Sequence, residues 1–257
     1  MTLEHYEEPP IVEVICGFRF ESIPGLDPLT IGWFAQEVRE RYPKREIRPA
    51  LADGDSAPPL GVVPLRAWLT SANGSFLLQV QHDRFYLNWR RVRDEPSYPR
   101  FNDHDGNPGI LSRALVELDA FQSFCATRLG HTVVVTETEL AKVDHLRQGT
   151  HWGSRADLLA LLPAFAPLAG LAGDEEALFG VHIVRPMEGG RQLLMSITMA
   201  GVAGVERVQL ETRSEGPFAK GASVEEAMRG HNEILNQIFA RAVPAELRGA
   251  LFRGGPR

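Results

Sequence analysis

Hydrophobic and polar positions along this chain follow one order of elements twice: a strand, a helix, three strands and a long helix. Alternation of apolar and polar residues predicts each strand, and apolar residues spaced three or four apart predict each helix. The first half places these elements at residues 11–20, 27–42, 65–92 and 110–129. The second half places them at residues 131–142, 154–162, 178–213 and 223–243. The chain is therefore expected to consist of two pseudo-repeats, residues 1–129 and 130–257.

The turn inside the first group of three strands predicts how they pair. Asn-Gly at residues 73–74 is a strong signal for a two-residue hairpin. Counting back from this turn places Leu69 opposite Leu78 and Ala67 opposite Val80, so that one face of the strands is apolar. The whole pattern predicts an α+β protein. Each pseudo-repeat is expected to be a curved antiparallel sheet backed by helices, with the two sheets able to join at the boundary between the halves.

Capping residues predict where three of the helices begin. Asp27 precedes Pro28, and proline suits the first position of a helix. Ser154 precedes the short helix of the second half. Ser223 forms a capping box with Glu226 at the start of the last helix.

The face of the first three strands opposite the apolar one is polar and aromatic. Amides and arginines around aromatic rings resemble a recognition surface, because planar stacking groups lie beside directional hydrogen-bonding groups. The candidate binding residues are Arg66, Trp68, Gln79, Gln81, Tyr86, Asn88 and Arg90 from the first half, with His182, Gln209 and Glu211 on the equivalent face of the second. The alternative is a plain solvated sheet face, which antiparallel sheets commonly have.

Composition and charge narrow the class of protein. With 257 residues and 44% hydrophobic content, the chain can bury a substantial core. Its formal net charge of −6 opposes non-specific binding to nucleic acid or anionic membrane, because both need a positive field. The longest apolar stretch, residues 158–171, is interrupted by prolines and is shorter than the roughly 20 residues of a membrane-spanning helix. The acidic N-terminus does not resemble a secretory signal, and Cys16 and Cys125 are expected to be buried thiols, so we expect a cytoplasmic protein.

Motifs of common enzymes and metal sites are absent from the sequence. It contains no phosphate-binding glycine loop, no Cys-x-x-Cys pair, no His-Glu-x-x-His helix and no Gly-x-Ser-x-Gly elbow. Residues 102–107 resemble a calcium loop only superficially, because the terminal glutamate is missing, and they predict a turn. Asp144 and His145 are neighbours on a strand and should point to opposite faces, so structural roles are favoured for them and for His182. We therefore predict no metal and no cofactor.

Four segments of the chain carry a resemblance to other proteins: Pro-Pro-Ile-Val-Glu-Val at 9–14, Leu-Gln-Val-Gln-His-Asp-Arg-Phe-Tyr-Leu-Asn-Trp-Arg at 78–90, Tyr-Pro-Arg-Phe at 98–101, and the helix at 231–239. With Phe-Arg-Phe at 18–20, they resemble a sporadically distributed bacterial family of similar length that has no assigned activity. The resemblance brings no substrate, cofactor or catalytic residue, and its patchy distribution implies association with defence or toxin–antitoxin systems. The duplicated order is also similar, in topology only, to the saddle of the TATA-box-binding protein superfamily, whose basic character this acidic chain lacks.

These observations favour a non-enzymatic binding or adaptor protein that recognises a protein partner, a second copy of itself or a small ligand through the polar sheet face. One alternative is an enzyme, or a subunit of one, whose site between the repeats is built from Glu13, His182 or Glu211. For Glu13, however, a buried ion pair with an arginine such as Arg19 is the preferred interpretation. A further alternative is nucleic-acid binding through the aromatic residues and a basic stretch, for which a solvated sheet edge is the favoured interpretation. This stretch contains Arg84, Arg90, Arg91, Arg93 and Arg100.

Overall fold

The computed structural model describes residue 6 and residues 9–51, 65–92, 98–163, 180–202 and 205–251. The strands are β1 (Ile11–Phe20), β2 (Lys44–Pro49), β3 (Leu65–Thr70), β4 (Phe76–Gln81), β5 (Arg84–Arg90), β6 (Val135–Arg147), β7 (Gly180–Pro186), β8 (Gln192–Val202) and β9 (Val205–Pro217). The helices are α1 (Pro28–Glu37), α2 (Ile110–Leu129), α3 (Arg155–Leu161), α5 (Val224–Ala242) and α6 (Ala245–Leu251), with a 3-10 turn η2 (Glu188–Gly190). Within these residues, no helix has both the length and the apolar character needed to cross a bilayer.

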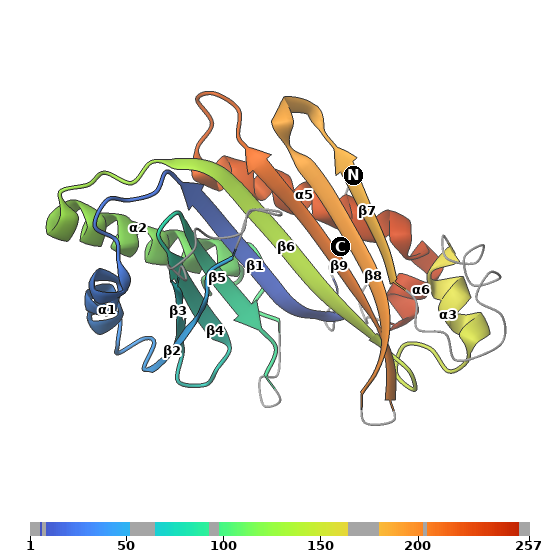
Figure 1. The fold of residues 1–257 in the computed structure, drawn as a ribbon. Helices are drawn as coiled ribbons and strands as arrows, with labels where there is room; N and C mark the ends of the chain where they lie inside the picture. The colour runs from blue at the N-terminus through green and yellow to red at the C-terminus, as the bar shows by residue number, and fades with distance from the viewer. Residues whose placement is uncertain are drawn as a thin grey trace.

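The described strands form one open antiparallel sheet of nine strands in the order β2-β3-β4-β5-β1-β6-β9-β8-β7. Strand β1 is central, because it pairs with β5 on one side and with β6 on the other. The helices α2 and α5 run behind this sheet, whereas no helix of the described ranges crosses its front (Figure 1). The prediction of an α+β protein with an antiparallel sheet backed by helices is confirmed. The strands belong to one continuous sheet, joined by the pairing of β1 with β6.

The strand register matches the sequence prediction in the first half. Leu69 lies opposite Leu78, and Ala67 lies opposite Val80. Leu78 in turn pairs with Leu87 on β5, and all of these side chains are buried on the helix-facing side. The hairpin at residues 73–74 therefore sets a register that keeps Ala67, Leu69, Leu78, Val80 and Leu87 toward the core.

Two elements of the structure are not predicted by the hydrophobic pattern. Strand β2 is the edge of the sheet, and all six of its residues are exposed, so it shows no alternation between apolar and polar positions. Its charged side chains and terminal Pro49 are typical of edge strands that do not pair further. Helix α6 follows Pro244, where the last helix is expected to end, because proline also suits the start of a new helix. The predicted loop at residues 49–64 lies mostly outside the described residues.

The caps predicted from the sequence are present at the helix starts. The Thr30 N–H donates to Asp27 Oδ1 at 2.9 Å, and Pro28 occupies the first turn of α1. Ser154 begins α3 and Ser223 begins α5, each in a capping box with the residue three positions later. These contacts satisfy backbone N–H groups that a helix leaves without partners at its start.

The main hydrophobic core lies between the sheet and the helices behind it. Its centre is a group of stacked and edge-on aromatic rings, with centroids 5.2 Å apart for Phe85 and Phe121 and 5.4 Å apart for Phe34 and Phe121. Cys16 and Cys125 lie in the same core as free thiols, as the sequence predicts. Burial raises the pKa of each thiol to about 12, which keeps both protonated and unreactive near neutral pH.

Candidate functional site

All ten residues predicted to bind a partner lie on the helix-free face of the sheet. Residues that pair directly across neighbouring strands project to the same face, so the register fixes this placement. One row of cross-strand partners runs from β5 to β7 through Arg90, Glu13, Val143, Glu211, Ser196 and His182. A second row runs from β3 to β1 through Trp68, Gln79, Tyr86 and Gly17. The function assigned to these residues stays a prediction, but they do share one surface.

Solvent reaches only some of these ten side chains. Six are exposed or half-buried: Arg66, Trp68, Arg90, His182, Gln209 and Glu211. Four are buried: Gln79, Gln81, Tyr86 and Asn88. The Gln81 side chain exchanges hydrogen bonds with the backbone of Leu51, accepting at 2.8 Å and donating at 3.0 Å. The four buried residues therefore support the surface, and the other six are the ones a partner can touch.

A chain of hydrogen bonds orders this face across four strands. Arg66 donates to Gln79 at 2.8 Å, Gln79 donates to Asn88 at 2.8 Å, and Asn88 donates to the Glu13 carboxylate at 2.7 Å. Burial raises the pKa of Glu13, and the hydrogen bond from Asn88 opposes this shift. The structure therefore pairs Glu13 with Asn88, whereas Arg19, the expected partner, lies 3.9 Å from Glu137. Buried polar networks of this kind hold their side chains in one arrangement.

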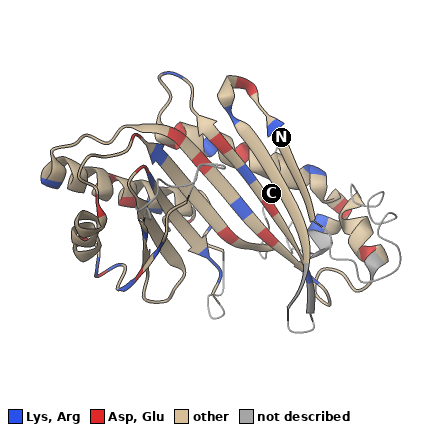
Figure 2. Ribbon diagram, viewed as in Figure 1, with Lys and Arg blue, Asp and Glu red and all other residues tan. Residues whose placement is uncertain are grey.

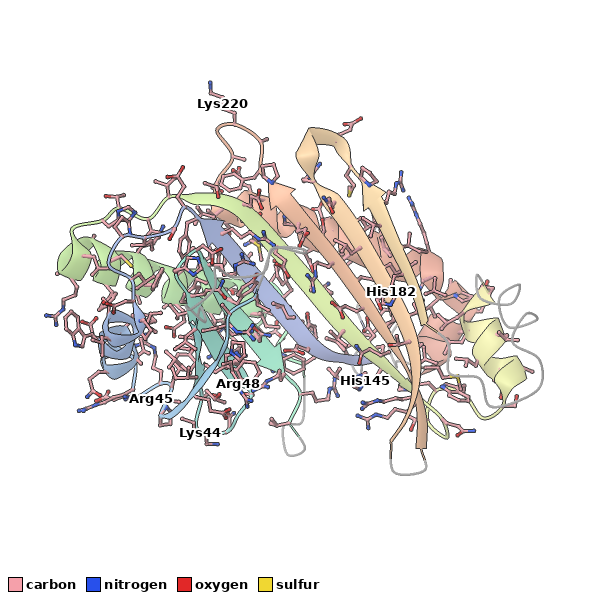
Figure 3. All side chains as sticks on the ribbon, in the orientation of Figure 1. Lys44, Arg45, Arg48, His145, His182 and Lys220 are labelled. Carbon is pink, nitrogen blue, oxygen red and sulfur yellow. The ribbon has the colours of Figure 1, made fainter. Side chains whose placement is uncertain are left out.

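Trp68 is surrounded by arginines at the β2–β5 end of the face. The guanidinium carbons of Arg48, Arg66 and Arg90 lie 4.9, 5.4 and 5.9 Å from the ring centroid. A cation over an aromatic ring is attracted by its negative face. Figure 3 labels Arg48 on this edge and His182 on β7, at the other side of the sheet. The cluster joins a planar aromatic group to several fixed hydrogen-bond donors.

The other half of the same face is rich in carboxylates. Arg213 on β9 lies 3.5 Å from Glu139, 3.0 Å from Glu211 and 3.9 Å from Glu215. The Tyr86 hydroxyl donates to Glu139 at 3.2 Å, and burial raises the pKa of this carboxyl. Acidic positions recur along β6 and β9 in Figure 2. Three carboxylates therefore gather around Arg213 in this half of the face, and Arg147 lies opposite Arg207 at the far end of β6 and β9.

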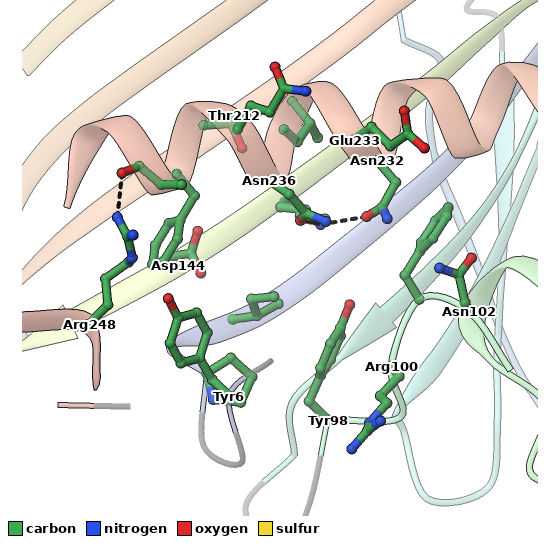
Figure 4. A pocket seen from close by; sticks show the side chains of 18 of the residues that line it. Tyr6, Tyr98, Arg100, Asn102, Asp144, Thr212, Asn232, Glu233, Asn236 and Arg248 are labelled. Carbon is green, nitrogen blue, oxygen red and sulfur yellow. Dashed lines mark hydrogen bonds between the residues drawn. The ribbon is translucent and has the colours of Figure 1, made fainter. Parts of the chain in front are cut away.

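A cavity of about 580 Å³ lies on the opposite, helix-facing side of the sheet (Figure 4). Strand β6 contributes Lys142 and Asp144, and helix α5 contributes Asn232 and Asn236. Its apolar and aromatic lining residues include Pro9, Ile11, Tyr98, Phe101, Leu235 and Phe239. Aromatic and apolar walls around a few convergent polar groups are typical of small-molecule sites, which range over roughly 300–1,000 Å³.

The polar groups of this cavity are deeply buried. Lys142 is 6% exposed, and its ammonium donates to Asn232 Oδ1 at 2.7 Å and to Asn236 Oδ1 at 2.6 Å. Asp144 is 3% exposed, and its Oδ1 has no hydrogen-bond partner. Burial lowers the pKa of Lys142 to about 8 and raises that of Asp144 to about 7, while attraction between the two charges opposes both shifts. Groups shifted in this way, in a cavity, are typical of functional sites.

Other residues discussed from the sequence lie apart from one another. Asp144 faces the cavity, whereas His145 lies on the other face and contacts Gln209 at 3.3 Å, as expected for neighbours on a strand. Arg84 and Arg90 lie on the helix-free face, Arg100 lines the cavity, Arg91 donates to the backbone oxygens of Ile11 and Pro9, and Arg93 is outside the described residues. Residues 102–107 form a turn, with Asp103 accepting from the Gly109 N–H at 2.7 Å at the start of α2. No cluster of metal-ligating side chains occurs in the described part of the chain.

The sequence analysis favours a structural role for Asp144, and it does not identify Lys142, Asn232 and Asn236 as candidate functional residues. A weak signal for them exists. Lys142 and Asp144 have the same strand parity as the apolar Leu140, so they must face the core, and Asn232 and Asn236 are one helical turn apart beside buried residues of α5. Polar residues at core positions need partners, and the two asparagine side chains accept hydrogen bonds from Lys142.

Comparison of the chain with protein-family models, with curated proteins and with solved structures finds no match. The resemblance to a sporadically distributed bacterial family therefore stays a prediction.

Proposed function

We propose that this protein is a non-enzymatic binding or adaptor protein that holds a protein partner on the helix-free face of its sheet. The observation that carries the proposal is the Trp68 cluster, in which three guanidinium groups lie within 5.9 Å of the ring centroid. Tryptophan and arginine are the residues that most often dominate the energy of protein interfaces. The hydrogen-bond chain from Arg66 to Glu13 keeps the surface in one arrangement before binding, which lowers the entropy lost on association.

The charge distribution favours a protein partner over nucleic acid. A nucleic acid presents a continuous row of phosphates and needs positive charge along its whole path. A nucleic acid bound at the Trp68 cluster and continuing along the sheet would bring its phosphates against the carboxylates of Glu139, Glu211 and Glu215. A protein surface with both signs of charge, including that of a second copy of this chain, is complementary to such a face.

The enzyme alternative has less support from the geometry of its residues. Glu13 lies on β1 and His182 lies on β7, four strands apart in the sheet order. At about 4.8 Å per strand, this separation is about 19 Å, too far for the two groups to act on one bond. Glu211 is held by Arg213 at 3.0 Å.

The strand order also supports the proposal of two pseudo-repeats. Counted outward from the central pair, one side runs β1, β5, β4, β3, β2 and the other runs β6, β9, β8, β7. The last three strands of each half thus return in reverse order beside its first strand. This is the arrangement expected if residues 1–129 and 130–257 are a duplication similar in topology to the TATA-box-binding saddle. From the resemblance to a sporadically distributed bacterial family we extend the proposal to a role in a bacterial defence or toxin–antitoxin system, and from the two buried thiols to the cytoplasm.

The proposal is tested by capturing partners of the tagged protein from its host after nuclease treatment, followed by titration of the purified partner. Trp68→Ala is expected to weaken this partner's affinity roughly thirtyfold, the equivalent of about 2 kcal/mol for an interface tryptophan. The matched control is Trp33→Ala, because Trp33 is 59% exposed on α1, away from this face. Unchanged affinity in Trp68→Ala, or capture of nucleic acid alone, would contradict the proposal.

A further inference from the structure

We infer that the cavity behind β6 binds a small zwitterionic molecule of the amino-acid class. Its ammonium group lies against Asp144, its carboxylate lies against Lys142 and the two asparagine amides, and its apolar or aromatic body lies along Tyr98 and Leu235. This site is on the opposite side of the sheet from the Trp68 cluster, so the inference does not depend on the proposed partner.

Asp144 supplies the first argument, because its Oδ1 is buried in the cavity wall without a hydrogen-bond partner among the described residues. Lys142 does not form an ion pair with Asp144 in this part of the chain, because its ammonium donates to Asn232 and Asn236. A buried carboxyl oxygen without a protein donor is costly, since no protein group replaces its lost solvation. A ligand ammonium is the group that satisfies it most completely, through a charge-assisted hydrogen bond. Figure 4 shows Asp144 among the side chains that line the cavity, with Tyr6 and Tyr98.

The wall formed by Lys142 and α5 supplies the second argument. The Lys142 ammonium has three N–H groups, two of which donate to the oxygens of Asn232 and Asn236. Because these amides use their oxygens for Lys142, their NH₂ groups are the ends that remain to serve as donors on the same wall. A ligand carboxylate accepts from several such donors at once. The Asp144 carboxylate, which accepts, and the amide and ammonium groups, which donate, thus line the same cavity. The ammonium and the carboxylate of an amino acid require such a pair of partners.

The overall charge of the lining supplies the third argument. Three basic side chains, Arg100, Lys142 and Arg248, and three acidic ones, Asp103, Asp144 and Glu233, border the cavity. The Arg248 guanidinium already donates to the carbonyl oxygens of Ala240 and Val243, at the end of α5. A purely anionic ligand would meet Asp144, and a purely cationic one would meet Lys142. A molecule with both charges and no net charge matches the cavity.

The remaining lining determines what kind of body such a ligand carries. Tyr98 packs edge-on against Trp89, with ring centroids 5.3 Å apart, which fixes one wall of the cavity. Phe101, Leu235 and Phe239 add apolar surface from the segment before α2 and from α5. A rigid aromatic wall favours a large apolar or aromatic side chain over a small or charged one.

The test is titration calorimetry of the full chain with each standard L-amino acid at millimolar concentration. Saturable binding of at least one with an apolar or aromatic side chain is expected. The affinity for that probe should fall about tenfold or more in Asp144→Asn and in Lys142→Met, a change of 1.4 kcal/mol or more. The matched controls Asp119→Asn and Lys220→Met are exposed and lie outside the cavity lining, and they should bind as the natural chain does.

Analogues of the best probe that lack either charged group identify the ligand class. The corresponding amine without the carboxylate, and the acid without the ammonium, should each bind about tenfold more weakly or worse. Asp144→Asn keeps the shape of the side chain and removes a buried charge, so it is expected to fold. If Lys142→Met does not fold, Asp144→Asn decides alone. The inference is overturned if no amino acid saturates the protein, if Asp144→Asn binds as tightly as the natural chain, or if either analogue equals the parent probe.

Discussion

Asp144→Asn isolates the effect of one buried charge on the stability of the fold. The Asp144 side chain is 3% exposed, and its Oδ1 has no hydrogen-bond partner. Burial raises the pKa of this carboxyl from 3.8 to about 7, even though attraction to Lys142 acts in the opposite direction. Asparagine has nearly the same shape without the charge. The substitution therefore removes the cost of burying an ionised carboxyl and leaves the packing almost unchanged.

The free-energy cost of burying the Asp144 carboxylate rises with pH. In the unfolded chain the carboxyl ionises near pH 3.8, whereas in the folded protein it holds its proton until about pH 7. The stability linked to this group is therefore fully present below pH 3.8 and is lost as the pH rises through about 7. A difference of about 3 pKa units corresponds to about 4 kcal/mol. The attraction to Lys142 is already part of this shift, and about 2 of the 3 units lie between pH 5 and pH 7, so we expect the stability gain of the variant to grow by about 1–3 kcal/mol across this range.

Urea unfolding of both proteins, followed by tryptophan fluorescence at about pH 5 and about pH 8, measures the difference. The advantage of Asp144→Asn over the natural chain should be larger at the higher pH by about 1–3 kcal/mol, and titrations of groups that do not interact with Asp144 cancel in the comparison. Asp119→Asn, at an exposed position of α2, should show no such pH-dependent gain. A stability gap that does not change with pH, or a loss of stability in Asp144→Asn at the higher pH, would refute the argument.

Three further substitutions or titrations test other parts of the structure. Gly17→Ala should destabilise the fold by about 1–3 kcal/mol, because the new Cβ would lie 2.5 Å from Tyr86 Cε1. Urea unfolding should show a smaller cost when Tyr86 is also replaced by alanine, and equal costs in both backgrounds would argue against the clash. Glu117→Gln should cost about 1–2 kcal/mol in the same assay, because the buried Glu117 carboxylate accepts from Arg41 at 2.9 and 2.8 Å and Arg41 is half-exposed. Burial lowers the pKa of His231 to about 4, so the stability that depends on its neutral form is present above 6.5 and is lost as the pH falls toward 4. An NMR titration in which the His231 ring protonates near 6.5 would contradict this.

The sequence predicts much of the fold because local signals and burial agree along most of the chain. The hairpin at residues 73–74 sets the pairing of Leu69 with Leu78, and Ser223 caps α5 as expected. Edge strand β2 is not predicted, because it has no buried face and its residues therefore show no alternation of apolar and polar positions. The pairing of β1 with β6 that makes the sheet continuous joins residues more than a hundred positions apart, which no local pattern records.

The helix-free face can be predicted from the sequence and the cavity cannot, for a physical reason. The helix-free face is built from strands joined by short turns, so counting from the turns places Trp68 and Arg90 on one surface. The cavity is formed where Lys142 of β6 meets Asn232 of α5, ninety positions later, and only the folded chain brings them to 2.7 Å.

Strand β6 separates the two sites while belonging to both. Its side chains alternate, so Glu139 lies on the helix-free face with Arg213, whereas Lys142 and Asp144 lie in the cavity. The backbone of β6 is held on one side by β1 and on the other by β9, which leaves a change in one side chain little freedom to move the opposite face. Trp68→Ala and Asp144→Asn therefore act as controls for each other: loss of partner binding in the first and of amino-acid binding in the second supports two independent sites. Loss of both activities in either variant would instead indicate a damaged fold, which the unfolding curves detect.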